Sequence, residues 1–178
     1  RREISAYMAR RFDLHYRFND QILVTVGGSE GIDLAIRCLV NPGDEVIVPV
    51  PSFVCYGPLV EMAGGTPVYL ELSVEDEFRL TPEKLKSVLT DRTKAVVLPF
   101  PCNPTGGIME RADLEAIAEV LRETSVMVIS DEIYAELTYG QRHVSMANLE
   151  EMYDRTIVVN GFSKSHAMTG WRMGYVCA

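Results

Sequence analysis

The sequence predicts an α/β fold of three layers, in which a mostly parallel sheet of seven strands lies between two layers of helices. Runs typical of strands alternate with runs typical of helices over almost the whole chain of 178 residues. Several strand runs are apolar at every position, as in residues 95–98 (AVVL), which is typical of parallel strands buried on both faces. A chain of this length is one ordinary domain, so we expect a single domain over residues 1–178.

The order of the elements follows from short-range patterns. Apolar or β-branched runs bounded by Gly, Pro or Asn predict strands at residues 22–26, 45–50, 66–72, 95–100, 126–130, 156–160 and 171–177. Apolar residues at helical spacing predict helices at residues 3–17, 29–40, 57–64, 81–90 and 110–123. The clearest helix start is Thr81-Pro82-Glu83, and Ser29 can cap the helix that follows the first strand.

Composition and charge exclude several classes of protein. Lys and Arg number 17 against 25 Asp and Glu, the formal net charge is -8, and no run of basic residues occurs, so we expect no nucleic-acid partner. No apolar stretch approaches the ~18 residues of a membrane span, and Arg1-Arg2-Glu3 is not followed by the apolar segment of a signal peptide. We therefore expect a cytoplasmic protein with no membrane partner.

The cysteines and histidines do not predict a metal centre. The four cysteines are scattered without a CxxC pair, and no histidine lies near them at a ligand-like spacing. We expect no metal and no disulfide framework, but buried free thiols in a reducing cytoplasm.

The residues that follow each strand are the candidates for a site, because ligands of such sheets bind outside the carboxyl ends of the strands. Gly28, Ser29 and Glu30 follow the first strand and open a helix, where exposed backbone N–H groups favour a phosphate. The segment is neither a Walker A loop nor a G-x-G-x-x-G fingerprint, and a plain tight turn is the alternative.

Two further strand ends carry residues with two interpretations each. Phe53 follows the second strand and can stack on a flat ligand, or it can be a core residue. Asn103 lies in a rigid loop with two prolines and two glycines, so its amide either faces the crevice or forms an Asx-type turn.

The last two strand ends carry the charged groups. Asp131 ends an apolar strand, where a carboxylate is costly to bury unless a cation pairs with it; an N-cap or a salt bridge is the alternative to a ligand cation. Lys164 follows the sixth strand among small hydroxyl residues, and desolvation beside a cation such as Arg172 can turn a lysine into a nucleophile. Arg172 can also grip a phosphate as a fork.

Taken together, these segments resemble the fold-type I aminotransferases of class I/II, which use pyridoxal 5′-phosphate. Residues 161–174 (GFSKSHAMTGWRMG) resemble the family's lysine-attachment segment, and the Asn-Pro-Thr-Gly loop, the Ser-Asp-Glu-Ile-Tyr segment and the phosphate loop follow the family's order. The resemblance covers nearly the whole chain and implies the family's large domain, with one antiparallel strand in the sheet. The aspartate and aromatic aminotransferases are the most similar branch.

The resemblance also implies a role for each candidate residue. Lys164 would form the Schiff base with the cofactor and later move the proton, Asp131 would pair with the pyridinium nitrogen, and Tyr134 would hydrogen-bond the ring's phenolic oxygen. Asn103 would share the last role and Phe53 would stack on the ring. The phosphate would be held by Gly28, Ser29, Glu30, Ser163 and Arg172, the first three partly through their backbone N–H groups.

The resemblance further implies what lies outside these residues. We expect residues 1–178 to be the cofactor-binding large domain of a longer homodimeric protein, without its upstream arm and its C-terminal small domain. The family's arginine for the substrate α-carboxylate belongs to that small domain, and a tyrosine given to the neighbouring active site belongs upstream.

The implied activity is transfer of an amino group between an L-amino acid and a 2-oxo acid. A pyridoxal-phosphate-dependent carbon–sulfur lyase on the same scaffold and an aminotransferase-like sensing domain of a transcriptional regulator remain as alternatives.

Overall fold

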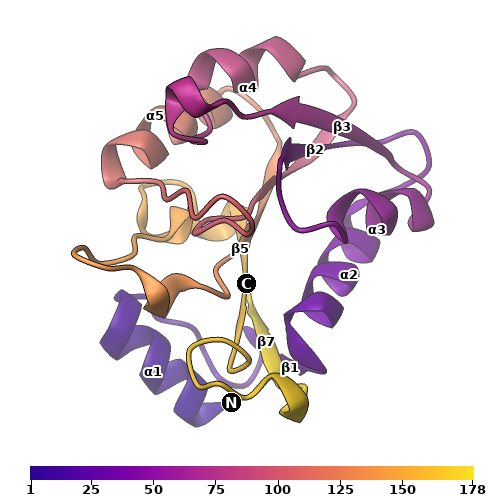
Figure 1. The fold of residues 1–178 in the computed structure, drawn as a ribbon. Helices are drawn as coiled ribbons and strands as arrows, with labels where there is room; N and C mark the ends of the chain where they lie inside the picture. Colours follow the sequence, from indigo (N-terminus) through magenta and orange to yellow (C-terminus); the bar gives the residue numbers. More distant parts are fainter.

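The computed structural model describes residues 1–178 and contains one seven-stranded sheet with helices on both faces (Figure 1). The strands are β1 (Ile22–Thr25), β2 (Glu45–Val50), β3 (Thr66–Glu71), β4 (Thr93–Leu98), β5 (Met127–Asp131), β6 (Thr156–Gly161) and β7 (Gly174–Cys177). The α-helices are α1 (Arg2–Phe12), α2 (Gly27–Leu39), α3 (Tyr56–Met62), α4 (Pro82–Val88) and α5 (Arg111–Arg122). The predicted fold class and order of elements are confirmed.

The sheet is parallel except at one strand. Its order is β1-β7-β6-β5-β4-β2-β3, and β7 runs antiparallel to both of its neighbours. All other neighbouring pairs are parallel. The carboxyl ends of β2, β4, β5 and β6 therefore lie side by side at one end of the strands. The turn that leads into β7 lies at the same end.

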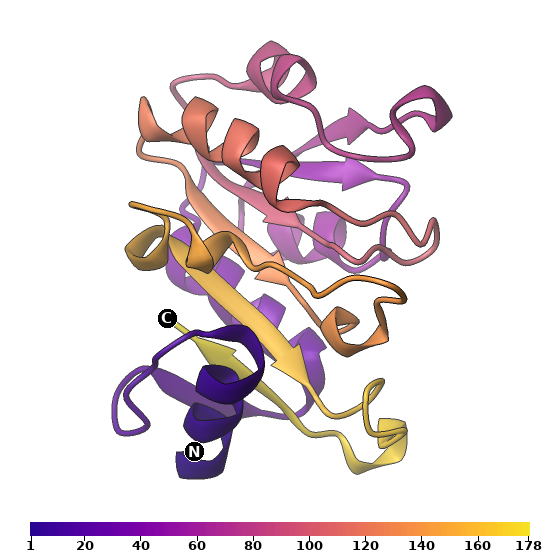
Figure 2. The same ribbon diagram turned by 90° about the vertical axis from the view of Figure 1, so that its left-hand side faces the viewer.

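Both faces of the sheet are buried, as the continuously apolar strand runs predict. Ala95 and Val97 of β4 pack with α2 and α3 on one face, whereas Val96 and Leu98 pack with α4 and α5 on the other. Helix α1 covers the second face over β6, β7 and β1, and Figure 2 shows α1 and α5 together in the layer nearest the viewer. This gives the three layers α/β/α.

Two predicted elements are shorter than expected, and a left-handed residue limits each. The first helix ends at Phe12 rather than at residue 17, because Asp13 has φ 55°. The last strand begins at Gly174 rather than at residue 171, because Thr169–Trp171 form a 3₁₀ turn and Arg172 has φ 50°. Neither left-handed residue fits a continuing helix or an extended strand.

The thiols follow the expectation only in part. All four cysteines are free, with Cys102 and Cys177 buried, but Cys38 is exposed and Cys55 is half-buried. The prediction that all four are buried is wrong for Cys38, which lies on the outer side of α2. No helix of the structure has the length and apolar character needed to cross a membrane.

Candidate active site

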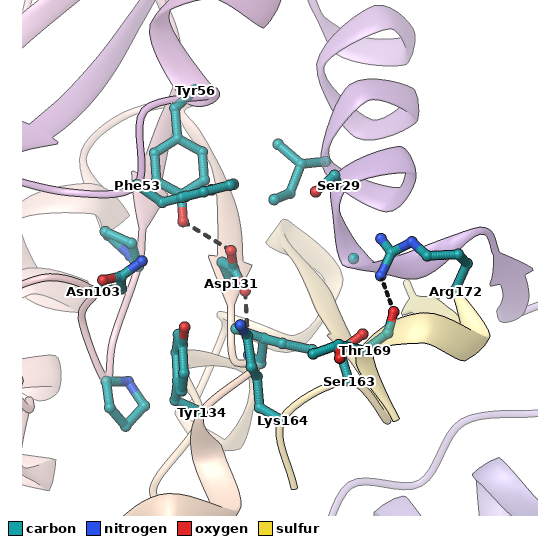
Figure 3. Close-up of a pocket in the computed structure, with 15 residues that line it drawn as sticks. Ser29, Phe53, Tyr56, Asn103, Asp131, Tyr134, Ser163, Lys164, Thr169 and Arg172 are labelled. Carbon is teal, nitrogen blue, oxygen red and sulfur yellow. Dashed lines mark hydrogen bonds between the residues drawn. The ribbon is translucent and has the colours of Figure 1, made fainter. Parts of the chain in front are cut away.

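A cavity of about 220 Å³ opens at the carboxyl edge of the sheet (Figure 3). Its walls come from the turns after β1, β2, β4, β5 and β6 and from the turn before β7. The lining residues are Gly28, Ser29, Ile32, Phe53, Tyr56, Pro99, Pro101, Asn103, Asp131, Ile133, Tyr134, Ser163, Lys164, Thr169 and Arg172. The structure therefore brings together every candidate residue of the sequence analysis except Glu30.

One end of the cavity is formed by the start of α2 and the Arg172 side chain. Gly27 has φ +78°, and a Cβ placed on it would lie 2.3 Å from Arg172 Nη2, so only glycine lets the guanidinium lie this close. Arg172 Nη1 donates to the Thr169 carbonyl oxygen at 2.7 Å, and no carboxylate pairs with Arg172. A cation beside a helix start, with donors still free, can hold a phosphate.

Ser29 does not cap the helix as predicted, and the Glu30 side chain lies outside the cavity lining. Helix α2 begins at Gly27, so Ser29 lies within its first turn instead of capping it, and its side chain lines the cavity. The Glu30 carboxylate turns back and accepts a hydrogen bond from the Val26 N–H at 2.5 Å, outside the cavity lining. The Glu30 side chain therefore bonds to the residue that precedes α2, and the contribution of its backbone N–H to a phosphate site stays a prediction.

The middle of the cavity carries a buried carboxylate. Asp131 Oδ2 accepts a hydrogen bond from the Tyr56 hydroxyl at 2.8 Å, and Oδ1 accepts one from the Ile133 N–H at 3.2 Å. Burial raises the pKa of Asp131 above its usual value, although both hydrogen bonds oppose the shift. No cationic side chain pairs with Asp131, so its buried carboxylate is left without a counter-charge, which a cationic ligand can supply.

Lys164 faces this region from the turn after β6. Its Nζ lies 5.5 Å from the centre of the Tyr134 ring, and its side chain is exposed and forms no salt bridge. Ser163 beside it is buried. Figure 3 shows Asp131, Tyr134 and Lys164 on the same side of the cavity. A primary amine without an ion-pair partner, in a cavity that also holds a buried carboxylate, can attack a carbonyl carbon and carry a proton.

Phe53 and Asn103 lie on the opposite wall. Phe53 is 39% exposed and packs edge-on against Tyr56, with ring centres 6.1 Å apart, so it is a wall of the cavity rather than a core residue. Asn103 lies in the loop held by the Cys102 and Gly107 backbone groups, and it lines the cavity as well. Both residues therefore lie at the crevice, and their contacts with a ligand stay a prediction.

Tyr56 is the main site residue that the sequence analysis missed. It lies at the start of α3, six residues after the end of β2, and is almost fully buried. An aromatic hydroxyl in the turn after a strand was the available signal, but nothing in the spacing indicates that the hydroxyl reaches the end of β5. Thr169, whose carbonyl holds Arg172, was also missed.

The model of the family described as aminotransferase class I and II matches residues 1–178. The chain belongs to this family. Its relatives include an aspartate aminotransferase of Geobacillus stearothermophilus, 45% identical over 175 residues that make up 97% of this chain and 44% of the relative. They also include an aspartate aminotransferase of Pyrococcus abyssi, 45% identical over 90% of this chain and 41% of the relative.

Solved structures agree with the family assignment. The aromatic aminotransferase from Pyrococcus horikoshii OT3 superposes with a TM-score of 0.97 at 42% identity, over 99% of this chain and 48% of that one. The chain spans less than half the length of the curated relatives it matches. The superposition therefore covers the domain with the cavity, and the remainder of those aminotransferases has no counterpart among the 178 residues.

Proposed function

We propose that these residues form the cofactor-binding large domain of an aminotransferase that moves an amino group between an L-amino acid and a 2-oxo acid. The observation that carries the proposal is the buried Asp131 carboxylate, which has no cationic partner and lies in one cavity with the unpaired Lys164 and Arg172. The relatives named above are aminotransferases, which supports this activity over the lyase and the sensing domain.

The residues of the cavity fit pyridoxal 5′-phosphate. This cofactor carries a phosphate, a ring nitrogen that can be protonated, a phenolic oxygen and an aldehyde, and it supplies an electron sink for the carbanion formed at the substrate's α-carbon. Arg172, Ser29, Ser163 and the first N–H groups of α2 would hold the phosphate, with Gly28 leaving room beside them. Asp131 would keep the ring nitrogen protonated, since its own charge is stabilised by the pairing.

The remaining residues would orient the ring and move the proton. Phe53 would cover one face of the ring, and Tyr134 and Asn103 would donate hydrogen bonds to the phenolic oxygen. Lys164 would hold the aldehyde carbon covalently, with loss of water, until the substrate's amino group displaces it. The freed Lys164 amine would then take a proton from the substrate's α-carbon and deliver it to the former aldehyde carbon. Tyr56 would hold Asp131 in line with the ring nitrogen.

The attachment residue is tested by chemical labelling. We expect borohydride treatment of the cofactor-loaded protein, followed by peptide mapping, to place the label on Lys164. The Lys164→Ala protein should carry no covalent cofactor, whereas a matched substitution of a lysine outside the cavity, Lys94→Ala, should label as the parent does. A label on another lysine, with Lys164→Ala still modified, would contradict the assignment.

The activity is tested by an amino-donor screen on the full-length protein. Aspartate, glutamate and tyrosine should each be offered, and formation of the corresponding 2-oxo acid followed. Release of a thiol from a sulfur amino acid, without transfer of its amino group, would instead support the lyase. Binding of the cofactor with no turnover of any donor would support the sensing domain.

Three further properties are part of the proposal. We infer a homodimer, because large apolar side chains such as Val54 and Trp171 are exposed beside the cavity, with exposures of 81% and 70%. We infer a cytoplasmic location, because four free thiols suit a reducing compartment. We infer a longer chain with a second domain, because the relatives are more than twice as long as the matched segment.

A further inference from the structure

A second buried carboxylate lies directly behind the cavity. Glu132 follows Asp131 in the chain and is completely buried, with 0% exposure. Its Oε1 accepts hydrogen bonds from the hydroxyls of Ser130 and Ser145, at 2.9 and 2.5 Å. Its Oε2 lies 3.0 Å from His143 Nε2, and neither of these two atoms has an aligned hydrogen bond. The proposed function uses none of these groups.

The two carboxylates lie on opposite faces of the sheet. Asp131 reaches the cavity and Tyr56, on the face covered by α2 and α3. Glu132 and Ser130 reach the other face, where a small space is lined by His143, Val144 and side chains around α5. Successive residues of a strand point to opposite faces, so the direction of one carboxylate fixes the direction of the other.

The backbone around Glu132 is held at the same time. The Glu132 N–H donates to the Val159 carbonyl at 2.8 Å, and the Glu132 carbonyl accepts from the Ala135 N–H at 2.9 Å. Ile133 and Tyr134, which line the cavity, lie in the turn that the second of these bonds closes. A rotation of the turn after β5 would have to break them and pull Glu132 away from its hydroxyl donors.

The partners of Glu132 are themselves anchored. Ser145 begins a short turn in which its backbone N–H donates to Asn148 Oδ1 at 3.0 Å. The Asn148 side chain donates to the Phe12 carbonyl at the end of α1, at 2.9 Å. The Phe12 ring also packs edge-on against the His143 ring, with centres 6.0 Å apart. The carboxylate is therefore tied to a rigid layer rather than to a loose loop.

We propose that Glu132 is a positioning residue for the cofactor site, which uses Ser130, Ser145 and His143 behind the sheet to hold Asp131 and Tyr134 at their places in front of it. A carboxylate removed from water is costly to the fold unless it is well bonded. The hydrogen bonds of Glu132 hold the turn after β5, which carries Asp131 and Tyr134 of the cavity. The inference rests on the proposed function, since it assigns Glu132 to the same site.

The test compares two buried glutamates in the full-length protein. Glu132→Gln keeps a carbonyl oxygen for the serine hydroxyls but removes the charge beside His143. The matched control is Glu45→Gln, because Glu45 is also buried, accepts from Thr90 at 2.6 Å and pairs with Arg92, but lies at the amino end of β2, away from the cavity. Unfolding midpoints in urea, the dissociation constant of pyridoxal phosphate and the absorbance of the bound cofactor across pH are measured for each variant.

We expect both variants to unfold at lower urea, but only Glu132→Gln to bind the cofactor about 10-fold more weakly or worse, as happens when groups that orient metal ligands are removed. The pH at which the bound cofactor changes colour should also shift in Glu132→Gln alone. Ser145→Ala removes only one hydrogen-bond donor to Glu132, so its cofactor binding should weaken less, in the same direction. This variant replaces Glu132→Gln in the test if Glu132→Gln does not fold.

Each result has a definite meaning. A Glu132→Gln or Ser145→Ala protein that loses stability but binds the cofactor with the parent's affinity and absorbance would overturn this inference alone. A parent protein that binds no pyridoxal phosphate would overturn the proposed function and this inference with it. Equal weakening of cofactor binding in Glu45→Gln would show that the weaker binding of Glu132→Gln follows from a general loss of stability. It would also overturn the inference.

Discussion

Asp131 is the residue at which the stability of the fold and the chemistry of the site conflict. It is fully enclosed, it has only neutral hydrogen-bond donors, and its pKa is raised by burial. An ionised carboxylate in such a place destabilises the folded protein until a cation arrives. Under the proposed function, the same arrangement would favour the cofactor's protonated ring nitrogen at this position.

Replacing Asp131 by Asn should separate the two effects. Because burial raises the pKa of Asp131 in the folded protein, the folded state holds the proton more tightly, and the parent loses stability as pH rises from the usual pKa of an aspartate to the raised one. Relative to the cofactor-free parent, Asp131→Asn should therefore gain stability as pH rises, by ~1.4 kcal/mol for each unit by which the pKa is raised. Urea unfolding between pH 4 and pH 8 measures the difference.

The same variant should be a poor enzyme when loaded with cofactor. Loss of a preorganised charge that acts in the transition state lowers turnover by roughly 10²–10³-fold. Cofactor binding should fall by less. A flat difference in stability with pH, or full transaminase activity, would show that Asp131 does not have the role assigned to it.

At the scale of single elements, an ion-pair cluster fixes α1 to the turn that follows Tyr134. Glu136 accepts hydrogen bonds from the Tyr7 hydroxyl at 2.6 Å and from Arg11 Nε at 2.8 Å. The Arg11 guanidinium lowers the pKa of Glu136 to about 2, well below the usual value for a glutamate. Because the folded pKa is lowered, the cluster stabilises the protein above pH 4.5, and this stabilisation is lost as pH falls towards 2.

Glu136→Gln should therefore cost stability in a pH-dependent way. We expect a loss of about 1–2 kcal/mol at pH 7, since the bonds involve a charged group but Arg11 is half exposed. The loss should shrink as the pH is lowered from 4.5. Glu119→Gln is the control, because Glu119 pairs with Arg122 on the exposed side of α5 and should change stability by no more than ~0.5 kcal/mol. Equal effects of both substitutions at pH 7 would argue against the cluster.

Most elements could be predicted from the sequence because their patterns are local. Continuous apolar runs give β4 and β5, and Thr81-Pro82-Glu83 gives the start of α4, where Thr81 accepts from the Lys84 N–H as expected. The end of α1 and the start of β7 could not be predicted, because Asp13 and Arg172 adopt left-handed conformations that neither residue type signals in the sequence.

The site could be predicted almost completely at the strand ends, and not behind them. Parallel strands bring their carboxyl ends together whatever their register, so Phe53, Asn103, Asp131 and Lys164 had to meet if the fold was right. Tyr56 and the partners of Glu132 depend on how a helix start and a long loop pack in three dimensions. No periodicity in the sequence records that packing.

At the scale of the whole molecule, the 178 residues should hold the cofactor site without the full substrate site. By the family resemblance, the arginine for the substrate α-carboxylate belongs to a small domain outside these residues. Orientation of bound reactants can account for ~7–11 kcal/mol of a barrier, so the loss of that grip should be severe. We therefore expect the isolated 178-residue chain not to transaminate at a useful rate.

The comparison needs both proteins in the same assay. Half-reactions with aspartate, glutamate and tyrosine should be followed by cofactor absorbance in the 178-residue chain and in the full-length protein. If the shorter chain converts the bound cofactor to its amine form as fast as the full-length protein does, then the substrate site lies within these residues after all.

The position of β7 sets the order in which the molecule can be built during translation. Strand β1 has β7 as its only neighbour in the sheet, and Ile22 pairs with Cys177. Residues 26–173 must be synthesised before this pairing can form, which at ~5–20 residues per second takes on the order of ten seconds. The start of α2 follows β1 and Arg172 precedes β7, so the end of the cavity beside Arg172 is assembled only after β7 has been made. A nascent chain without β7 therefore lacks this end of the cavity and leaves β1 unpaired, exposed to chaperones and to other growing chains.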